Sequence, residues 1–253
     1  MLICGAGAVL VVAKLIGFFA IDQTFDIRAI DLSYGLIAGV AVTVSNILLL
    51  ECLTHLDVSL GSTIYRLNTV AVLILSYWFL SEPFGLVKAL GIVSGIGATL
   101  LLLETESGRT VSPALFGRFF LLAIVTSLSR AVYGVISKAG LTEGADPHML
   151  ILLAGLSWMA GGLTYAQWRE GSIAVSRTMI GYALVAGLLV VVVVHALIAA
   201  VQLAEASVVI PIANLSFCVA LLIALVASME RLTLRKTSAV GLASLAIVLL
   251  AQA

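Results

Sequence analysis

The chain repeats itself at a fixed offset of 148 residues, and no gap is needed to align the two copies. Residues 1–103 and 149–251 share 23 identities, among them Glu82 with Glu230. This similarity exceeds what a biased composition produces by itself, so we interpret it as an internal duplication. Both copies must then form the same structural unit, which restricts the fold to two related halves.

Each copy consists of apolar runs separated by short polar connections. Hydrophobic residues make up 62% of the chain and charged residues 10%, with a mean hydropathy of +1.22, whereas soluble domains carry about 25% charged residues. We therefore predict an all-α integral membrane protein, because open sheets in lipid would leave backbone groups unpaired. A span needs about 20 residues, and the runs predict about nine transmembrane helices. They cover residues 1–20, 32–51, 59–80, 85–103, 114–138, 147–168, 179–201, 206–228 and 236–252.

The number of spans inside the offset determines how the copies are oriented. The run at 1–20 lacks the positive start of a signal peptide and has a mid-chain partner at 149–168, so we count it as a span. Five spans then separate the start of one copy from the start of the other. Because five is odd, equivalent helices cross the membrane in opposite directions, which is the inverted-topology repeat typical of secondary transporters.

The first copy begins one helix later than the second. The span at 114–138 precedes the second copy, and its counterpart would lie before Met1. We therefore expect either that translation begins upstream of Met1 or that the protein is a nine-span variant.

The order of motifs resembles the EamA repeat of the drug/metabolite transporter superfamily. The first copy carries Ser59 to Asn68, then Ser81-Glu82-Pro83, then a small-residue span with Gly91 and Gly95; the second carries Ala206 to Asn214 and Glu230. The resemblance implies two EamA-like repeats, 1–103 without its first helix and 114–253. It also implies ten spans in a complete member and transport of small metabolites or drugs without a cofactor. The expected partners are the lipid bilayer and a small-molecule substrate, and a homodimer is left open.

Arg66 is the first candidate for binding a substrate. It stands about seven residues inside the third predicted span, with Tyr65 and Asn68 beside it. A charged side chain within lipid is costly and indicates function, and a guanidinium binds a carboxylate or phosphate through two hydrogen bonds. The alternatives are that Arg66 extends to the interface or pairs with a neighbouring helix.

A polar stripe on the fifth predicted span supplies a second candidate. Ser127, Arg130, Gly134 and Ser137 share one helical face, with Tyr133 at its edge. Such a face is turned to a bundle interior or a water-filled cavity. We expect Arg130 and Tyr133 to contact substrate, and Lys138 to extend toward the interface.

His195 lies within an unbroken apolar run. It is either a proton-coupling residue, because the histidine pKa is within the physiological range, or an interhelical hydrogen-bonding residue. Asn46 and Asn214 are likewise either cavity contacts or interhelical hydrogen-bonding residues, and the same alternatives apply to Lys14.

Glu82 and Glu230 have a structural interpretation. Each precedes a predicted helix, where a carboxylate can accept from the first unpaired N–H groups. Gly91 and Gly95 form a small-residue ridge for close helix packing, and Pro211 is expected to bend its span.

Other function classes are disfavoured. There is no basic run or phosphate-binding loop, which argues against nucleic-acid binding and against an ATP-driven pump. Three isolated cysteines and the lack of a catalytic or metal-ligating constellation argue against an enzyme and against a metal site.

Orientation is left open. Seven Lys and Arg residues gather on the side of Met1 and three on the other side, which places Met1 inside the cell. The family resemblance implies the reverse.

The sequence thus predicts a secondary transporter in the plasma or inner membrane, not driven by ATP. It would export or import a small metabolite or drug-like solute by alternating access, around a cavity lined by the third, fifth, seventh and eighth spans. The alternative is a bundle that does not transport, either an accessory subunit or an inactive truncated paralogue.

Overall fold

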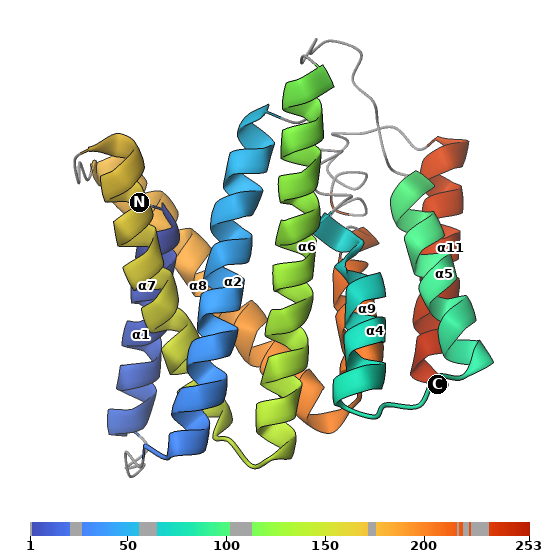
Figure 1. Cartoon of the computed structure of the whole chain (residues 1–253), viewed down its shortest axis with the longest axis horizontal. Coiled ribbons are helices and arrows are strands. Elements are labelled where there is room, and N and C mark those ends of the chain that lie inside the picture. The colour runs from blue at the N-terminus through green and yellow to red at the C-terminus, as the bar shows by residue number, and fades with distance from the viewer. Residues whose placement is uncertain are drawn as a thin grey trace. The chain divides into compact units, whose positions relative to one another are not determined.

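The computed structural model of the chain describes residues 2–20, 27–55, 65–101, 113–171, 176–216, 218–219, 223 and 233–253. All regular structure in this part of the chain is α-helical, which confirms the predicted fold class. The helices are α1 (Leu2–Ala20), α2 (Ala29–His55), α4 (Asn68–Phe79), α5 (Leu86–Leu101), α6 (Pro113–Thr142), α7 (Pro147–Glu170), α8 (Arg177–Leu203), α9 (Ala206–Asn214) and α11 (Leu234–Ala251) (Figure 1).

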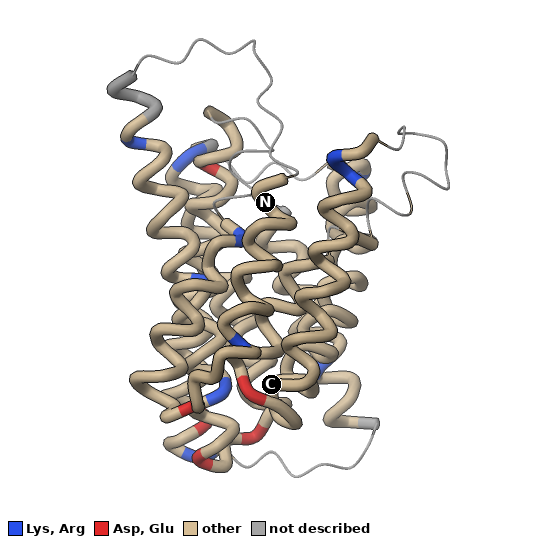
Figure 2. Tube along the Cα trace, turned by 90° about the vertical axis from the view of Figure 1, so that its right-hand side faces the viewer, with Lys and Arg blue, Asp and Glu red and all other residues tan. Residues whose placement is uncertain are grey.

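Several helices have the length and composition of membrane spans. Five described helices of at least 18 residues are apolar enough to cross a bilayer, with a mean hydropathy of 2.9 in α8. Figure 2 shows long stretches of helix without a charged residue. Large apolar side chains are also exposed along α8, where Leu188 and Val192 are 61% and 67% accessible. Exposed apolar area on this scale is expected in contact with lipid and not with water.

The helix boundaries follow the predicted spans with two differences. The third span was expected to be one helix over 59–80, but a turn at Leu67 interrupts it, and residues 59–64 lie outside the described part. The eighth span was expected over 206–228, but α9 ends at Asn214 in a turn at Leu215 and Ser216. Pro211 lies inside α9, and the helix ends three residues later, at Asn214; the bend expected from this residue stays a prediction.

The chain divides into two compact units, and each contains helices from both copies of the repeat. The first unit comprises residues 1–48 and 132–203, and the second comprises residues 49–131 and 204–253. Two pairs of repeat-equivalent helices, α1 with α7 and α5 with α11, pack against each other inside a unit. The predicted division into repeats at 1–103 and 114–253 is a division by sequence, and it stays a prediction.

In the first unit, α1 packs against its repeat equivalent α7 and against α8 (Figure 1). Glycines allow α1 and α7 to approach each other closely. A Cβ on Gly7 would lie 2.9 Å from the carbonyl oxygen of its equivalent Gly155, and a Cβ on Gly162 would lie 2.6 Å from the backbone nitrogen of Cys4. Later residues of one helix therefore face earlier residues of the other, so the two helices are antiparallel.

In the second unit, α5 packs against its repeat equivalent α11 (Figure 1). A Cβ on Gly91 would lie 2.8 Å from Leu250 Cγ, and a Cβ on Gly97 would lie 3.8 Å from Leu242 Cδ1. This pair is antiparallel as well. Equivalent helices that pack antiparallel confirm the inverted topology that the offset of 148 residues predicted.

Candidate functional site

The candidate site lies in the second unit, where two spans are interrupted at repeat-equivalent positions. Leu67 forms a turn before α4, and its equivalent Leu215 forms a turn after α9. The N–H of Val70 donates to Leu67 O at 3.1 Å, and that of Cys218 donates to Leu215 O at 2.9 Å. These bonds between residues three apart are 3₁₀ geometry, which often marks a functional hinge within a helix. Interrupted spans at equivalent positions of an inverted repeat are also where transporters bind their substrates.

Arg66 and Asn214 stand at equivalent positions of the two interruptions and contact each other. Arg66 Nη1 donates to the backbone oxygen of Asn214 at 2.7 Å. In return, Asn214 Nδ2 lies 3.5 Å from the backbone oxygen of Arg66. Each side chain thus reaches a carbonyl group at the opposite interruption. The exchange is reciprocal because the two positions are related by the repeat.

Asn214 also joins the first turn of α4. Its Nδ2 donates to Asn68 Oδ1 at 2.5 Å and to Thr69 Oγ1 at 2.9 Å. The Asn68 side chain is fully buried, and its Nδ2 has no hydrogen-bond partner among the described residues. A buried donor without a partner is costly, so this group is suited to a bound water or a polar solute.

Arg130 and Tyr65 belong to the same unit. The Arg130 guanidinium lies over the Tyr65 ring, 5.9 Å from its centroid, within the range of a cation–π contact. Along α6, Ser127 and Ser137 are buried, as the polar stripe predicted. Tyr133 is buried in an apolar cluster with Ala38 and Val42 of the first unit.

A small cavity adjoins the Arg66–Asn214 contact. It has a volume of about 10 Å³ and is bounded by residues of α4, α5, α9 and α11, so it has room for about one water molecule. Of the described residues that line it, Arg66 alone carries a charge. Thr69, Thr99 and Asn214 supply the remaining polar side chains. The lining therefore has one cation, hydroxyl groups and an amide, set among apolar residues.

Glu82 caps the helix that carries Asn214, and not the helix that follows it in sequence. Its carboxylate accepts from the N–H groups of Ala206 at 2.8 Å and Ser207 at 3.0 Å, and from the Ser207 hydroxyl. The expected cap on the following helix is therefore wrong. The reason is that α5 begins only at Leu86, whereas Glu205, at the N-cap of α9, makes no side-chain cap. Glu230 lies outside the described residues.

Lys88 completes this network, and no role was predicted for it from the sequence. It is 1% exposed and donates to Pro83 O at 2.8 Å, to Ser207 Oγ at 3.0 Å and to the Glu205 carboxylate. Its recurrence in the repeat as Lys236, six residues after Glu230, was the available signal. The network determines where α9 begins, and so where Asn214 lies.

The remaining candidates lie in the first unit. Asn46 is half-buried on α2. His195 Nδ1 contacts Val191 O of its own helix at 2.6 Å, so this bond is not interhelical. Lys14 Nζ contacts His148 Nδ1 at 2.8 Å, which joins α1 to α7. Lys138 Nζ donates to Val201 O at 2.8 Å near the end of α8, and its expected extension toward the interface stays a prediction.

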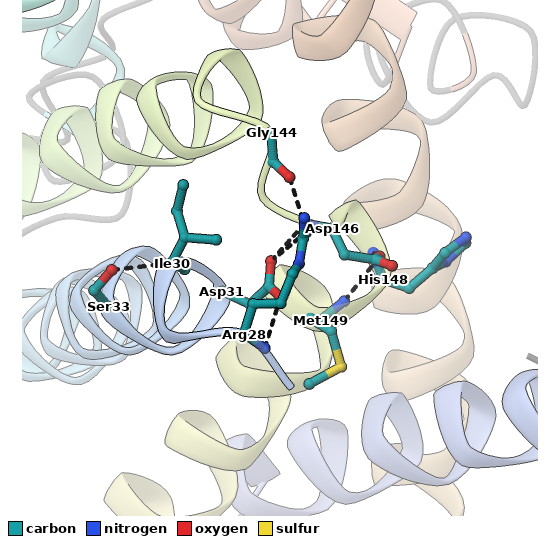
Figure 3. Close-up of polar contacts among 8 residues, drawn as sticks. All are labelled: Arg28, Ile30, Asp31, Ser33, Gly144, Asp146, His148 and Met149. Atoms are coloured by element: carbon teal, nitrogen blue, oxygen red, sulfur yellow. Dashed lines mark hydrogen bonds and ion pairs between the residues drawn. The ribbon is translucent and has the colours of Figure 1, made fainter. Parts of the chain in front are cut away.

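A polar network at the start of α7 was also missed (Figure 3). Arg28 pairs with the buried carboxylate of Asp31 at 3.0 Å, and Asp31 Oδ1 accepts from the N–H of Asp146 at 2.7 Å. Asp146 is the N-cap of α7 and accepts from the N–H groups of His148 and Met149. An aspartate followed by proline at the first helical position is a recognisable helix start, so the Asp146–Pro147 pair was a usable signal.

Among the described residues, no group of histidine, cysteine, aspartate and glutamate side chains is arranged to hold a metal ion. The polar groups of the candidate site are guanidinium, amide and hydroxyl groups together with backbone carbonyls. This chemistry favours reversible binding of a polar solute.

Comparisons with known proteins agree with the resemblance drawn from the sequence. The model of the EamA-like transporter family matches residues 1–104, which confirms the resemblance over this segment. A solved structure described only as "Crystal structure of protein" superposes with a TM-score of 0.84 at 12% identity, covering 99% of this chain and 87% of that chain. This likeness shows the fold. No curated protein matches the chain.

Proposed function

We propose, because residues 1–104 match the model of the EamA-like transporter family, that this protein is a secondary carrier of a small solute. It would work in the plasma or inner membrane by alternating access. The observation that carries the proposal is the reciprocal contact of Arg66 with Asn214 at two interrupted, repeat-equivalent spans. A site that is formed by equivalent positions of two inverted repeats can be opened to either side of the membrane by related movements of the two repeats.

The chemistry of the site favours a solute with an anionic group. Arg66 is the one charge among the described lining residues, and Arg130 adds a second guanidinium in the same unit. Guanidinium groups bind carboxylates and phosphates through paired hydrogen bonds. Asn68 Nδ2 supplies a buried donor. In the present conformation the cavity holds about one water, so binding requires the contact between Arg66 and Asn214 to open.

The test is uptake of labelled solutes by proteoliposomes that contain the purified full chain. A suitable panel consists of the radiolabelled L-amino acids, pyruvate, lactate, citrate and inorganic phosphate. We expect at least one anionic member to enter faster than into empty liposomes. Arg66→Ala and Arg130→Ala should abolish that flux, while the protein still inserts and remains monodisperse in detergent.

The controls separate transport from an accessory role. Arg118→Ala changes an exposed arginine near the start of α6 and should leave uptake unchanged. Normal uptake by both Arg66→Ala and Arg130→Ala would contradict the assignment of the site. No uptake of any panel member by the wild-type chain would favour the alternative of a bundle that does not transport.

A further inference from the structure

Lys14 and His148 form a pair of basic side chains in the first unit, and neither residue belongs to the candidate site. Lys14 on α1 is 6% exposed, and its Nζ lies 2.8 Å from Nδ1 of His148, at the start of α7. This is the one hydrogen bond of the Lys14 ammonium among the described residues. A buried ammonium is normally paired with an acid. Here its described partner is another base.

The bond limits where the protons can be, because the donor and acceptor roles depend on the histidine tautomer. A charged lysine is a donor only, whereas each nitrogen of a neutral imidazole is either a donor or an acceptor. With Lys14 as the donor, Nδ1 of His148 must be unprotonated and the imidazole proton must be on Nε2. The bonded pair therefore carries one positive charge. A second proton, added at Nδ1, removes the acceptor and leaves two cations 2.8 Å apart, which repel each other.

The two partners belong to different helices, and hydrogen bonds at the start of α7 hold the backbone of His148 in place. The backbone of His148 is held by Asp146, which in turn is held by Asp31 and its partner Arg28, and the imidazole extends away from that pair (Figure 3). Lys14 belongs to α1, which packs against α7 and α8. Breaking the bond therefore acts on the contact between the repeat-equivalent helices α1 and α7.

The other titratable and charged groups around the pair are few in the described part of the chain. Asp146 interacts electrostatically with Lys14, but its carboxylate already accepts two backbone N–H groups of α7. On α8, His195 is close enough to interact electrostatically with both Lys14 and His148. The Phe18 ring meets the His148 ring edge-on at 6.3 Å. A proton added at His148 is therefore close to two basic side chains, Lys14 and His195, and to the Phe18 ring.

We propose that the Lys14–His148 pair is a proton-binding site, and that the proton it takes up is the coupling ion of transport. A proton arriving at His148 Nδ1 breaks the bond to Lys14 and loosens α1 from α7; its departure restores the bond. Histidine is the side chain that ordinarily exchanges a proton between pH 5 and 8. The coupling part of this inference rests on the proposed transport function, whereas the proton-binding part does not.

Thermal unfolding at different pH values tests proton binding without any substrate. The proposal requires that the bonded pair holds one proton fewer than the two side chains hold when they are separated in the unfolded chain. Stability must then fall as the pH falls. For the full chain in detergent, we expect the unfolding midpoint to be about 2–4 °C lower at pH 5.5 than at pH 7.5 through this pair.

Variants of all three histidines identify the group that titrates. In His148→Gln, the amide oxygen still accepts from Lys14 but does not titrate, so this acid sensitivity should disappear. Lys14→Gln should remove it too, because a protonated His148 then has no cation to repel. His55→Gln, a change outside the first unit, should retain it. Retained sensitivity in both His148→Gln and Lys14→Gln, or its loss in His195→Gln alone, would overturn the assignment.

Proteoliposome uptake tests the coupling. With the same solute panel, an imposed pH gradient should change wild-type uptake several-fold, and His148→Gln should respond to the gradient no more than empty liposomes do. Exchange without a gradient should persist in His148→Gln. A wild-type chain that transports but ignores the gradient would overturn the coupling. A wild-type chain that moves no panel member, with the acid sensitivity intact, would count against the proposed transport and not against the proton site.

Discussion

At the scale of single residues, the placement of α9 depends on the carboxylate of Glu82, which lies in the connection between α4 and α5. Glu82 accepts from two N–H groups at the start of α9 and is 7% exposed, whereas Glu205, the acidic partner of Lys88, has a side chain that is 34% exposed. A carboxylate at a helix N-terminus contributes up to about 2 kcal/mol when partly buried. Without the Glu205 carboxylate, the buried Lys88 ammonium still donates to Pro83 O and Ser207 Oγ, which offsets part of the loss.

Glu82→Gln should therefore destabilise the protein by about 1–2 kcal/mol, and Glu205→Gln by less. The reason is that glutamine retains one acceptor but not the charge. The measurement is the midpoint of thermal unfolding of each variant in the same detergent. Equal midpoints for Glu82→Gln and the wild type would show that the cap on α9 is not needed.

At the scale of helices, the α1–α7 contact depends on the absence of side chains at a few glycines. A Cβ on Gly7 would lie 2.7 Å from the backbone nitrogen of Met159, whereas a Cβ on Gly17, in the same helix, meets nothing within 4 Å. Backbone cannot move aside as a flexible side chain can. The two positions therefore form a matched pair.

Gly7→Ala should destabilise the protein by about 1–3 kcal/mol through overpacking. Gly17→Ala should be neutral or stabilising, because alanine favours a helix over glycine by about 1 kcal/mol. Chemical denaturation in mixed micelles measures both. A Gly7→Ala variant as stable as Gly17→Ala would contradict the close α1–α7 packing.

The sequence was sufficient for most of the described helices, but not for the turn at Leu67 or for the hydrogen bonds between helices. Long apolar runs determine spans by length, so α5, α7 and α8 begin and end within a few residues of their predicted bounds. The turn at Leu67 carries no glycine or proline, and no local signal predicted it. Arg66, Asn68 and Asn214 were recognised as candidates because polar residues in lipid are rare. Their mutual contact was not recognised, since it depends on packing between positions 148 residues apart.

At the scale of the whole molecule, the repeat makes a claim about sidedness. Gly85 and Thr233 are equivalent positions immediately before α5 and α11, and both are exposed. Because the two copies are inverted, these residues must face opposite sides of the membrane. Charge counting and the family resemblance disagree on which side is which.

Single cysteines at Gly85→Cys and Thr233→Cys, introduced after Cys4, Cys52 and Cys218 are replaced by alanine, test this claim. A membrane-impermeant maleimide should label one of them in intact cells and the other only after permeabilisation. The one labelled in intact cells also gives the orientation. Labelling of both from the same side would contradict the inverted topology.

The central claim is that the site at the Arg66–Asn214 contact binds one solute and opens alternately to the two sides of the membrane. Counterflow tests it most directly, because an alternating carrier exchanges solute faster than it moves it in one direction. Proteoliposomes loaded with an unlabelled member of the solute panel should transiently accumulate the same labelled solute above its external concentration. Arg66→Ala should abolish that overshoot. A wild-type chain that equilibrates the label with no overshoot, or moves none, would contradict the account.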